Sequence, residues 1–335
     1  MKSGLEKVIK KYFKDISNIT YQPLQGGSIN TTFIVRNQKD EYILQKMHSI
    51  FKPSLMHNIS LVANHVKGKK IKVPKPIKTL DGKYFYKNKR NKDWYRLFSY
   101  IPGKTIGSVT SSNQAKEAGK MVGILHSSLL HFNGKLTYSL PHYRDTAFYI
   151  KKLSGLVATN SKNQKYKELV VLSKRILIHY QNLPKNLDTL PQRVIHGDLK
   201  ISNIIFDKNI KKGLGVIDLD TVMYGSIILD MGDGLRSWCM EGGEDVDIVI
   251  FNKKYYKSAV AGYLSEAKFL TKEEAQHIPD GVKLITLELA ARFSIDAFEE
   301  KYFMLDKSKY KNLFEQNKKR ASNQLKFFEI FFETF

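Results

Sequence analysis

The chain has 335 residues, of which 42% are hydrophobic, so it is long and apolar enough for one large domain or two lobes with a sizeable core. Its formal net charge is +23, but the lysines and arginines are scattered in short clusters, which predicts no specific nucleic-acid site. No apolar run is long enough for a membrane span or a secretory signal. The single cysteine, Cys239, excludes an internal disulfide. These features favour a cytoplasmic enzyme.

The N-terminal third predicts short strands with two helices. Apolar residues at helical spacing indicate a helix over residues 4–13, and Pro53 opens a second one over residues 53–66. Alternating apolar residues and intervening turns indicate strands over residues 19–25, 31–36, 42–47 and 94–100. We therefore expect residues 1–98 to form a β-rich small N-terminal lobe and residues 99–103 to form a hinge.

After the Pro102-Gly103 turn the pattern becomes mostly helical. Helices are expected over residues 113–130, 145–158, 164–179, 247–264, 272–277, 279–300 and 307–332. A strand-rich island interrupts them over residues 194–220. Residues 104–335 are therefore predicted to form an α-rich large lobe, and a two-lobed chain usually binds its ligand between the lobes.

The strand-rich island carries polar residues where apolar strands end. Asp198 follows one such strand, and Asp218 follows another. Carboxylates at the ends of buried strands are costly unless they bind something. Phosphoryl transfer needs one carboxylate to orient the attacking hydroxyl and accept its proton, with an amide oxygen and a second carboxylate to hold magnesium. Asp198, Asn203 and Asp218 fit these roles by type, order and spacing, although turn and cap residues between strands are the alternative.

His196, Asp198 and Asn203, followed after a strand by Asp218 and Asp220, resemble the signature of the protein-kinase-like phosphotransferases that include aminoglycoside and choline kinases. The resemblance implies a protein-kinase-like α+β fold, with a β-rich small lobe and an α-rich large lobe. It implies ATP and Mg²⁺ as cofactors and a small-molecule acceptor. It assigns Asp198 as the catalytic residue and Asn203 and Asp218 as metal ligands.

Three further groups of residues are similar to the N-acetylhexosamine 1-kinase branch, and they are residues 217–233, 42–56 and 286–296. This resemblance implies transfer to the anomeric C1 hydroxyl of N-acetylglucosamine or N-acetylgalactosamine. It implies that Arg292 and Tyr302 contact the acceptor and that Ser28 lies at an acceptor-binding position. A kinase for an aminoglycoside, choline or an amino alcohol remains the alternative. A non-catalytic nucleotide-binding protein is a further one, and the oligomeric state is left open.

Several residues are expected to bind the nucleotide. The Gly26-Gly27-Ser28 turn would cover the phosphates, since glycine allows close backbone approach, and a plain hairpin turn is the alternative. Lys46 is the nearest cation on the third strand, but Gln45 and Lys46 point to opposite faces, so either one could face the phosphates. The adenine is expected to contact backbone groups of the connector and an apolar floor residue, which are Phe98, Ser99, Tyr100, Ile101 and Ile217.

Other polar residues are expected to support the site rather than react. Kinase-like folds usually pair their strand lysine with a glutamate on the next helix, but residues 53–66 contain no acidic residue. Asp230 is expected to brace the catalytic loop through hydrogen bonds, and His196 to hold that loop in shape. His126 is interpreted as a core histidine with its hydrogen bonds satisfied.

Overall fold

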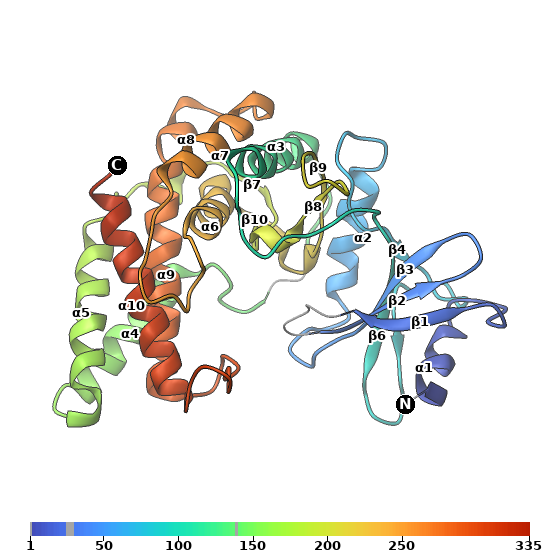
Figure 1. The fold of residues 1–335 in the computed structure, drawn as a ribbon, viewed down its shortest axis with the longest axis horizontal. Helices are drawn as coiled ribbons and strands as arrows, with labels where there is room; N and C mark the ends of the chain where they lie inside the picture. Colours follow the sequence, from blue (N-terminus) through green and yellow to red (C-terminus); the bar gives the residue numbers. More distant parts are fainter. Residues whose placement is uncertain (1, 25–29, 138–139) are drawn as a thin grey trace.

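The computed structural model describes residues 2–24, 30–137 and 140–335 (Figure 1). Its N-terminal part is a six-stranded antiparallel sheet in which β5 pairs with β6 beside the main path. The order along that path is β1-β2-β3-β6-β4. The strands are β1 (Thr20–Leu24), β2 (Thr31–Arg36), β3 (Glu41–Lys46), β4 (Pro76–Ile77), β5 (Tyr86–Lys87) and β6 (Trp94–Ser99). The four longer strands match the predicted ones.

Helices cover the sheet on both sides. Helix α1 (Lys2–Ile9) packs on one face, where Val8 and Ile9 share a buried cluster with Val35, Leu44 and Leu97. Helix α2 (Leu55–His65) buries its apolar residues in a different cluster, which continues into the helical part of the chain. We call the sheet with α1 and α2 the small lobe, and the part from α3 onward the large lobe.

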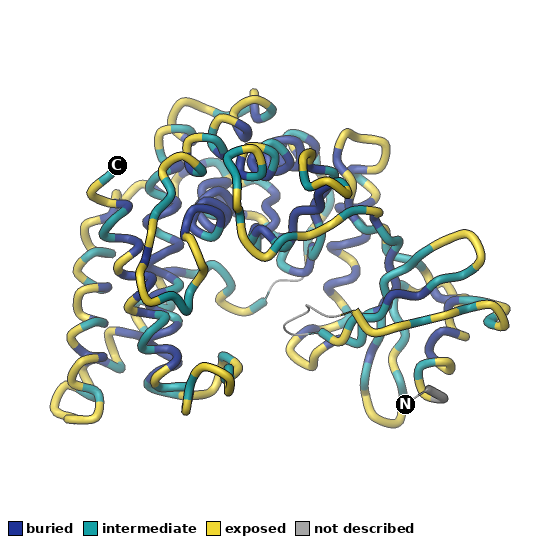
Figure 2. Tube along the Cα trace, in the orientation of Figure 1, coloured by how far each residue is buried: buried dark blue, intermediate teal, exposed yellow. Residues whose placement is uncertain are grey.

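The large lobe is built on helices, so the predicted α+β arrangement is confirmed (Figure 1). The helices are α3 (Ser112–Leu129), α4 (Thr146–Asn160), α5 (Lys167–Gln181), α6 (Ile227–Cys239), α7 (Lys253–Glu266), α8 (Lys272–Gln276), α9 (Ile278–Glu299) and α10 (Leu313–Phe332). Helices α6 and α9 are buried along most of their length, whereas α5 exposes one face to solvent (Figure 2). Among the described residues, no helix combines the length and apolar character that crossing a membrane requires.

Two short antiparallel pairs of strands hold the strand-rich island together. Strand β7 (Gln192–Ile195) pairs with β10 (Met223–Ser226), and β8 (Ile204–Phe206) pairs with β9 (Gly213–Val216). The segment that carries Asp198 follows β7, and Asp218 follows β9. The island was predicted, and its two strand pairs bring the two polar segments close to each other.

Two helices begin later than predicted, and in both cases an asparagine sets the start. The side chain of Asn252 accepts a hydrogen bond from the Tyr255 amide, so α7 begins at Lys253 rather than near residue 247. Asn312 accepts from the Glu315 amide in the same way, so α10 begins at Leu313 rather than at residue 307. An N-cap asparagine satisfies a backbone N–H that the first helical turn leaves without a partner.

Candidate active site

The loop that carries Asp198 is held by Asp230, in the first turn of α6. Asp230 accepts hydrogen bonds from the backbone amides of His196 and Gly197, both at 2.6 Å. Its Oδ2 atom also lies 3.0 Å from Nε2 of the buried His126. Burial opposes the charge of Asp230, but the hydrogen bond and charge from His126 outweigh it and hold the pKa of the carboxyl below its usual value. The predicted bracing role of Asp230 is confirmed.

His126 and Gly197 contribute to this support in different ways. The second nitrogen of His126 lies 3.0 Å from the Tyr263 hydroxyl, so His126 is a core histidine with both ring nitrogens satisfied, as expected. Gly197 has a φ of +86°, and a Cβ atom there would lie 2.7 Å from the Thr221 carbonyl oxygen. Glycine fits this position without strain, whereas a side chain there would force the Thr221 backbone to shift.

Asp198 lies at the end of this loop with 25% of its side-chain surface exposed. Its Oδ2 atom accepts hydrogen bonds from Lys200 Nζ at 2.9 Å and from Asn203 Nδ2 at 3.2 Å. Burial opposes the carboxylate charge, yet the nearby Lys200 and Arg144 keep the pKa of Asp198 below its usual value. Asp198 is therefore ionised at neutral pH, and its Oδ1 atom is the one left for a ligand hydroxyl. The sequence analysis did not single out Lys200, although its position two residues after Asp198 was visible.

The turn that carries Asp218 is tied directly to the Asp198 loop. The Ile217 carbonyl is hydrogen-bonded to His196 Nε2 and its amide donates to the Asn203 carbonyl, both at 2.9 Å. The Thr221 hydroxyl donates to the His196 carbonyl at 2.8 Å. Asp218 itself has a left-handed backbone, with φ +67° and ψ +57°, which is uncommon for a residue with a side chain. The expected role of His196 in shaping the loop is confirmed.

Asn203 and Asp218 have the chemistry of a magnesium site. The Asn203 amide nitrogen donates to Asp198, so the amide oxygen is the atom available to a metal. Burial and repulsion from Asp220 and Asp198 raise the pKa of Asp218 to about 6, a repulsion that a divalent cation would relieve. Hard oxygen donors suit Mg²⁺. No group of three or more His, Cys, Asp or Glu residues with metal-binding geometry occurs in the part of the chain that the structure describes. The two residues therefore fit a metal that also binds phosphates and water.

The connector residues predicted to contact adenine are partly engaged within the small lobe. The Ser99 amide donates to the Lys75 carbonyl at 2.9 Å, and the Tyr100 amide donates to the Glu41 carbonyl at 3.1 Å. Phe98 and Ile101 are buried, and Ile217 is half-buried at the start of the Asp218 turn. Their contacts with adenine stay predictions. The Gly26-Gly27-Ser28 turn lies outside the described residues.

The two residues at the end of β3 point to opposite faces, as alternation requires. Leu44 lies in the cluster under α1, so Gln45 faces the other side of the sheet, where its Oε1 atom accepts a hydrogen bond from Arg96 Nε at 2.9 Å. Lys46 forms an ion pair with Asp93 at 2.5 Å. A contact between Lys46 and nucleotide phosphates stays a prediction.

Arg292 and Tyr302, predicted to bind the acceptor, lie together at the end of α9. The Arg292 Nη2 atom donates to the Tyr302 hydroxyl at 3.1 Å, and the guanidinium lies over the rings of Tyr302 and Tyr149, 5.4 and 5.3 Å from their centroids. The nearest carboxylate oxygen, on Glu288, is 3.9 Å away. The Arg292 fork is thus held by aromatic rings and a long ion pair, an arrangement that leaves hydrogen-bonding capacity for a ligand.

Tyr143 and Arg144 are site residues that the sequence analysis missed. Both donate to the Gly197 carbonyl, the Tyr143 hydroxyl at 2.9 Å and Arg144 Nε and Nη2 at 2.9 and 2.6 Å. Burial raises the pKa of Tyr143, and this phenol interacts electrostatically with both Asp198 and Arg292. Tyr143 therefore links the Asp198 loop to the Arg292 region. The partners lie more than 50 residues apart, and no spacing in the sequence joins them.

Comparisons with known proteins agree with this geometry. The model of the family described as "Phosphotransferase enzyme family" matches residues 20–263. A homoserine kinase from Zymomonas mobilis is 25% identical over 263 residues, covering 76% of this chain and 74% of the relative. Two solved structures share the fold: a microcompartment-associated aminopropanol kinase and the amicoumacin kinase hAmiN in complex with AMP-PNP, Ca²⁺ and Ami. Their TM-scores are 0.65 and 0.63, their identities 16% and 15%, and the matches cover 100% and 96% of this chain and 98% and 93% of theirs.

Proposed function

Because the chain belongs to the phosphotransferase enzyme family, and is thus a small-molecule kinase, we propose that ATP is its phosphoryl donor, that Mg²⁺ is its metal, and that its acceptor is an alcohol bearing a carbonyl or carboxylate oxygen. The observation that carries this proposal is the direct hydrogen bonding between the Asp198 loop and the Asp218 turn. It supports one site in which a base and two metal-binding side chains act on the same phosphoryl group. We expect the reaction to occur in the cytoplasm.

The proposed mechanism assigns a separate task to each of these side chains. Asp198 accepts a hydrogen bond from the acceptor hydroxyl through Oδ1 and aligns the hydroxyl oxygen for in-line attack, and it takes up the proton late. Lys200 and Asn203 occupy Oδ2, which fixes the orientation of the carboxylate. Asn203 and Asp218 would hold the metal, which when bound neutralises charge on the phosphates.

Arg292 is the residue that we propose reads the acceptor. An N-acetylhexosamine, phosphorylated at its C1 hydroxyl, would place its amide carbonyl on the guanidinium fork. A homoserine-like amino alcohol, which the likeness to a homoserine kinase favours, would place its carboxylate there. A purely cationic acceptor such as choline fits less well. Glu288 already lies 3.7 Å from Arg144 and 3.9 Å from Arg292, so its charge is balanced.

An acceptor panel tests the proposal. The purified chain is given ATP and Mg²⁺ with N-acetylglucosamine, N-acetylgalactosamine, homoserine, 1-amino-2-propanol, choline or kanamycin. ADP release gives the rate, and phosphorus NMR identifies the product. We expect turnover with an N-acetylhexosamine or with homoserine. Turnover confined to choline or kanamycin would contradict the proposed acceptor class.

A variant at the acceptor side separates recognition from chemistry. Arg292→Lys keeps the charge but loses the planar fork, so the KM for the acceptor should rise while the KM for ATP stays unchanged. Arg175→Lys is the matched control, because Arg175 lies on α5 with 52% of its side chain exposed. An unchanged acceptor KM in Arg292→Lys would remove Arg292 from the proposed acceptor site.

A further inference from the structure

Arg96 reaches from the small lobe to the turn that follows Asp218. It lies on β6, and its two terminal nitrogens donate to the two carboxylate oxygens of Asp220 at 2.5 and 2.9 Å. Its Nε atom donates to Gln45 at 2.9 Å. Only 2% of the Arg96 side chain and 4% of the Asp220 side chain are exposed. The guanidinium is therefore buried and paired within the protein, so we expect it to act on a ligand through its partners.

The pair takes a place that kinase-like folds usually give to other residues. Their strand lysine is normally held by a glutamate on the next helix, and it links the small lobe to the phosphates. Here α2 contains no acidic residue, and Lys46 is paired with Asp93 on the opposite face of the sheet. On the face that carries Gln45, Arg96 forms an ion pair with Asp220 of the large lobe, and no other ion pair between the two lobes occurs among the described residues.

Asp220 is placed to control the orientation of Asp218. The two residues are separated by one position, and residues Leu219–Thr221 form a single turn of 3₁₀-helix. A bidentate arginine–carboxylate pair fixes its carboxylate at two points and so limits rotation of the turn. The left-handed backbone of Asp218 is uncommon, and such a conformation persists only where the surroundings enforce it. Arg96 supplies one anchor, and the Thr221–His196 hydrogen bond supplies another.

We propose that Arg96 is a positioning residue for phosphoryl transfer. Through Asp220 it fixes the turn that carries Asp218, and it joins the metal-binding side chain to the sheet of the small lobe. In this chain the pair thus performs the bracing that the lysine–glutamate pair performs elsewhere. The inference rests on the proposed function, because it requires Asp218 to bind the metal of a metal–nucleotide complex.

The experiment measures binding rather than turnover. The dissociation constant of a non-hydrolysable ATP analogue is determined by calorimetry, with and without Mg²⁺, for the wild-type chain, Arg96→Gln and the double variant Arg96→Gln/Asp220→Asn. We expect Mg²⁺ to tighten binding by the wild-type chain. In Arg96→Gln, the factor by which Mg²⁺ tightens binding should be smaller by about tenfold or more. This is the size of effect seen when a partner of a metal ligand is removed. Binding without Mg²⁺ should stay unchanged.

Two comparisons exclude a general structural effect. Arg193 of β7 forms a similar bidentate pair with Glu274 of α8, at 2.7 and 3.0 Å, but this pair lies within the large lobe and does not join the two lobes. Arg193→Gln should lower the melting temperature without reducing the Mg²⁺ effect. The double variant Arg96→Gln/Asp220→Asn removes both charges, so it should regain stability yet keep the same Mg²⁺ defect as Arg96→Gln.

The following outcomes would contradict the proposal. A full Mg²⁺ effect in Arg96→Gln would overturn the role of Arg96. If Arg96→Gln does not fold, Arg96→Lys and Asp220→Asn take its place, and a full Mg²⁺ effect in both would overturn it equally. A wild-type chain whose analogue binding ignores Mg²⁺ would instead overturn the proposed function, and this inference with it.

Discussion

Arg144 donates two hydrogen bonds to the carbonyl oxygen of Gly197, the residue immediately before Asp198. The same guanidinium lies 2.9 Å from Asp233, which in turn accepts a hydrogen bond from the Leu199 amide. The peptide groups on both sides of Asp198 are therefore held by one buried arginine–aspartate pair. Such a support fixes the position of the Asp198 backbone without contacting its carboxylate.

Replacing Arg144 by Gln should both destabilise the fold and slow turnover. The change removes the nearest cation from the buried Asp233 and Glu288, and breaking a buried pair in this way costs about 3 kcal/mol or more. Urea unfolding gives the stability, and kcat reports the loop. In the control Arg175→Gln, which breaks a largely exposed pair with Glu329, the cost should be at most about 1 kcal/mol. Equal losses in the two variants would contradict the buried brace.

Replacing Asp198 by Asn should abolish the proton-accepting group while preserving the loop. The asparagine can still hydrogen-bond to its neighbours, so we expect kcat to fall by about 10²–10⁴-fold with little change in ATP affinity. Turnover and nucleotide binding are measured separately. Asp207→Asn is the control, since that carboxylate is partly exposed and accepts hydrogen bonds from nearby backbone amides. Turnover comparable to the wild-type chain would overturn the assigned role of Asp198.

The local part of the site could be predicted from sequence, and the long-range part could not. Asp198 and Asp218 each follow a short apolar strand, and Asn203 lies five residues after Asp198, so residue type, order and spacing were enough to predict that they lie together. Arg96 and Asp220 are 124 positions apart, and nothing near either residue indicates the other. Arg144 likewise meets Gly197 only because α4 packs against the large-lobe core.

The sheet shows a similar limit. Strands of five or six residues carry enough alternation to be recognised, whereas β4 and β5 have two residues each and carry none. Alternation also indicated that Gln45 and Lys46 face opposite ways, but only the packing of α1 against Leu44 decides which face each one takes. Asn312, the N-cap residue of α10, was a signal that sequence reasoning overlooked.

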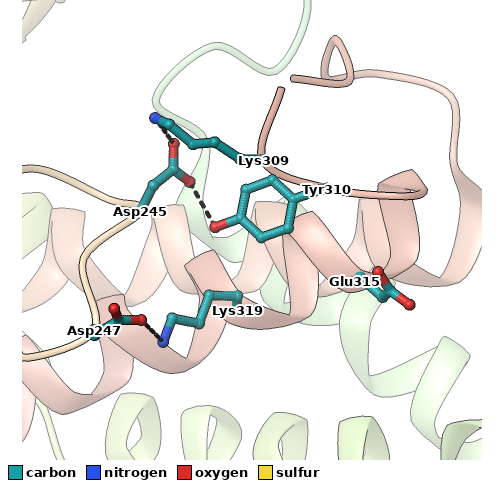
Figure 3. Close-up of a pocket in the computed structure, with 6 residues that line it drawn as sticks. All are labelled: Asp245, Asp247, Lys309, Tyr310, Glu315 and Lys319. Carbon is teal, nitrogen blue, oxygen red and sulfur yellow. Dashed lines mark hydrogen bonds and ion pairs between the residues drawn. The ribbon is translucent and has the colours of Figure 1, made fainter. Parts of the chain in front are cut away.

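Asp245 should stabilise the chain at neutral pH and lose that effect in acid. It lies on the segment before α7 and accepts hydrogen bonds from Arg320 at 2.6 and 2.8 Å. It also accepts one from the Tyr310 hydroxyl at 3.1 Å (Figure 3). The Arg320 hydrogen bonds lower the pKa of Asp245 below its usual 3.8. A lowered pKa stabilises the folded state above the unfolded-state value, and the effect is lost as the pH falls through the folded-state value. Asp245→Asn should cost about 1–3 kcal/mol at pH 7.

Urea unfolding at pH 7 and near pH 3 checks this prediction. The difference between Asp245→Asn and the wild-type chain should shrink steadily below pH 3.8, the usual pKa of the group. Asp247→Asn is a neighbouring control: its side chain is 98% exposed and pairs with Lys319 at 3.3 Å (Figure 3), so it should change stability little. A difference for Asp245→Asn that is constant across this pH range would mean that the carboxylate charge is not what stabilises the segment.

Two glycine-to-alanine changes should have opposite effects on stability, because one glycine lies at a helix contact and the other does not. A Cβ atom at Gly119 of α3 would lie 2.0 Å from the Ala259 carbonyl oxygen of α7, a backbone atom that cannot move without separating the helices. Gly119→Ala should therefore cost about 1–3 kcal/mol through overpacking. A Cβ atom at Gly155 of α4 would have no atom within 4 Å outside its own stretch of helix. Gly155→Ala should therefore stabilise the helix by about 0.5–1 kcal/mol. Urea unfolding measures both, and a stabilising Gly119→Ala would show that α3 and α7 are not held at this spacing.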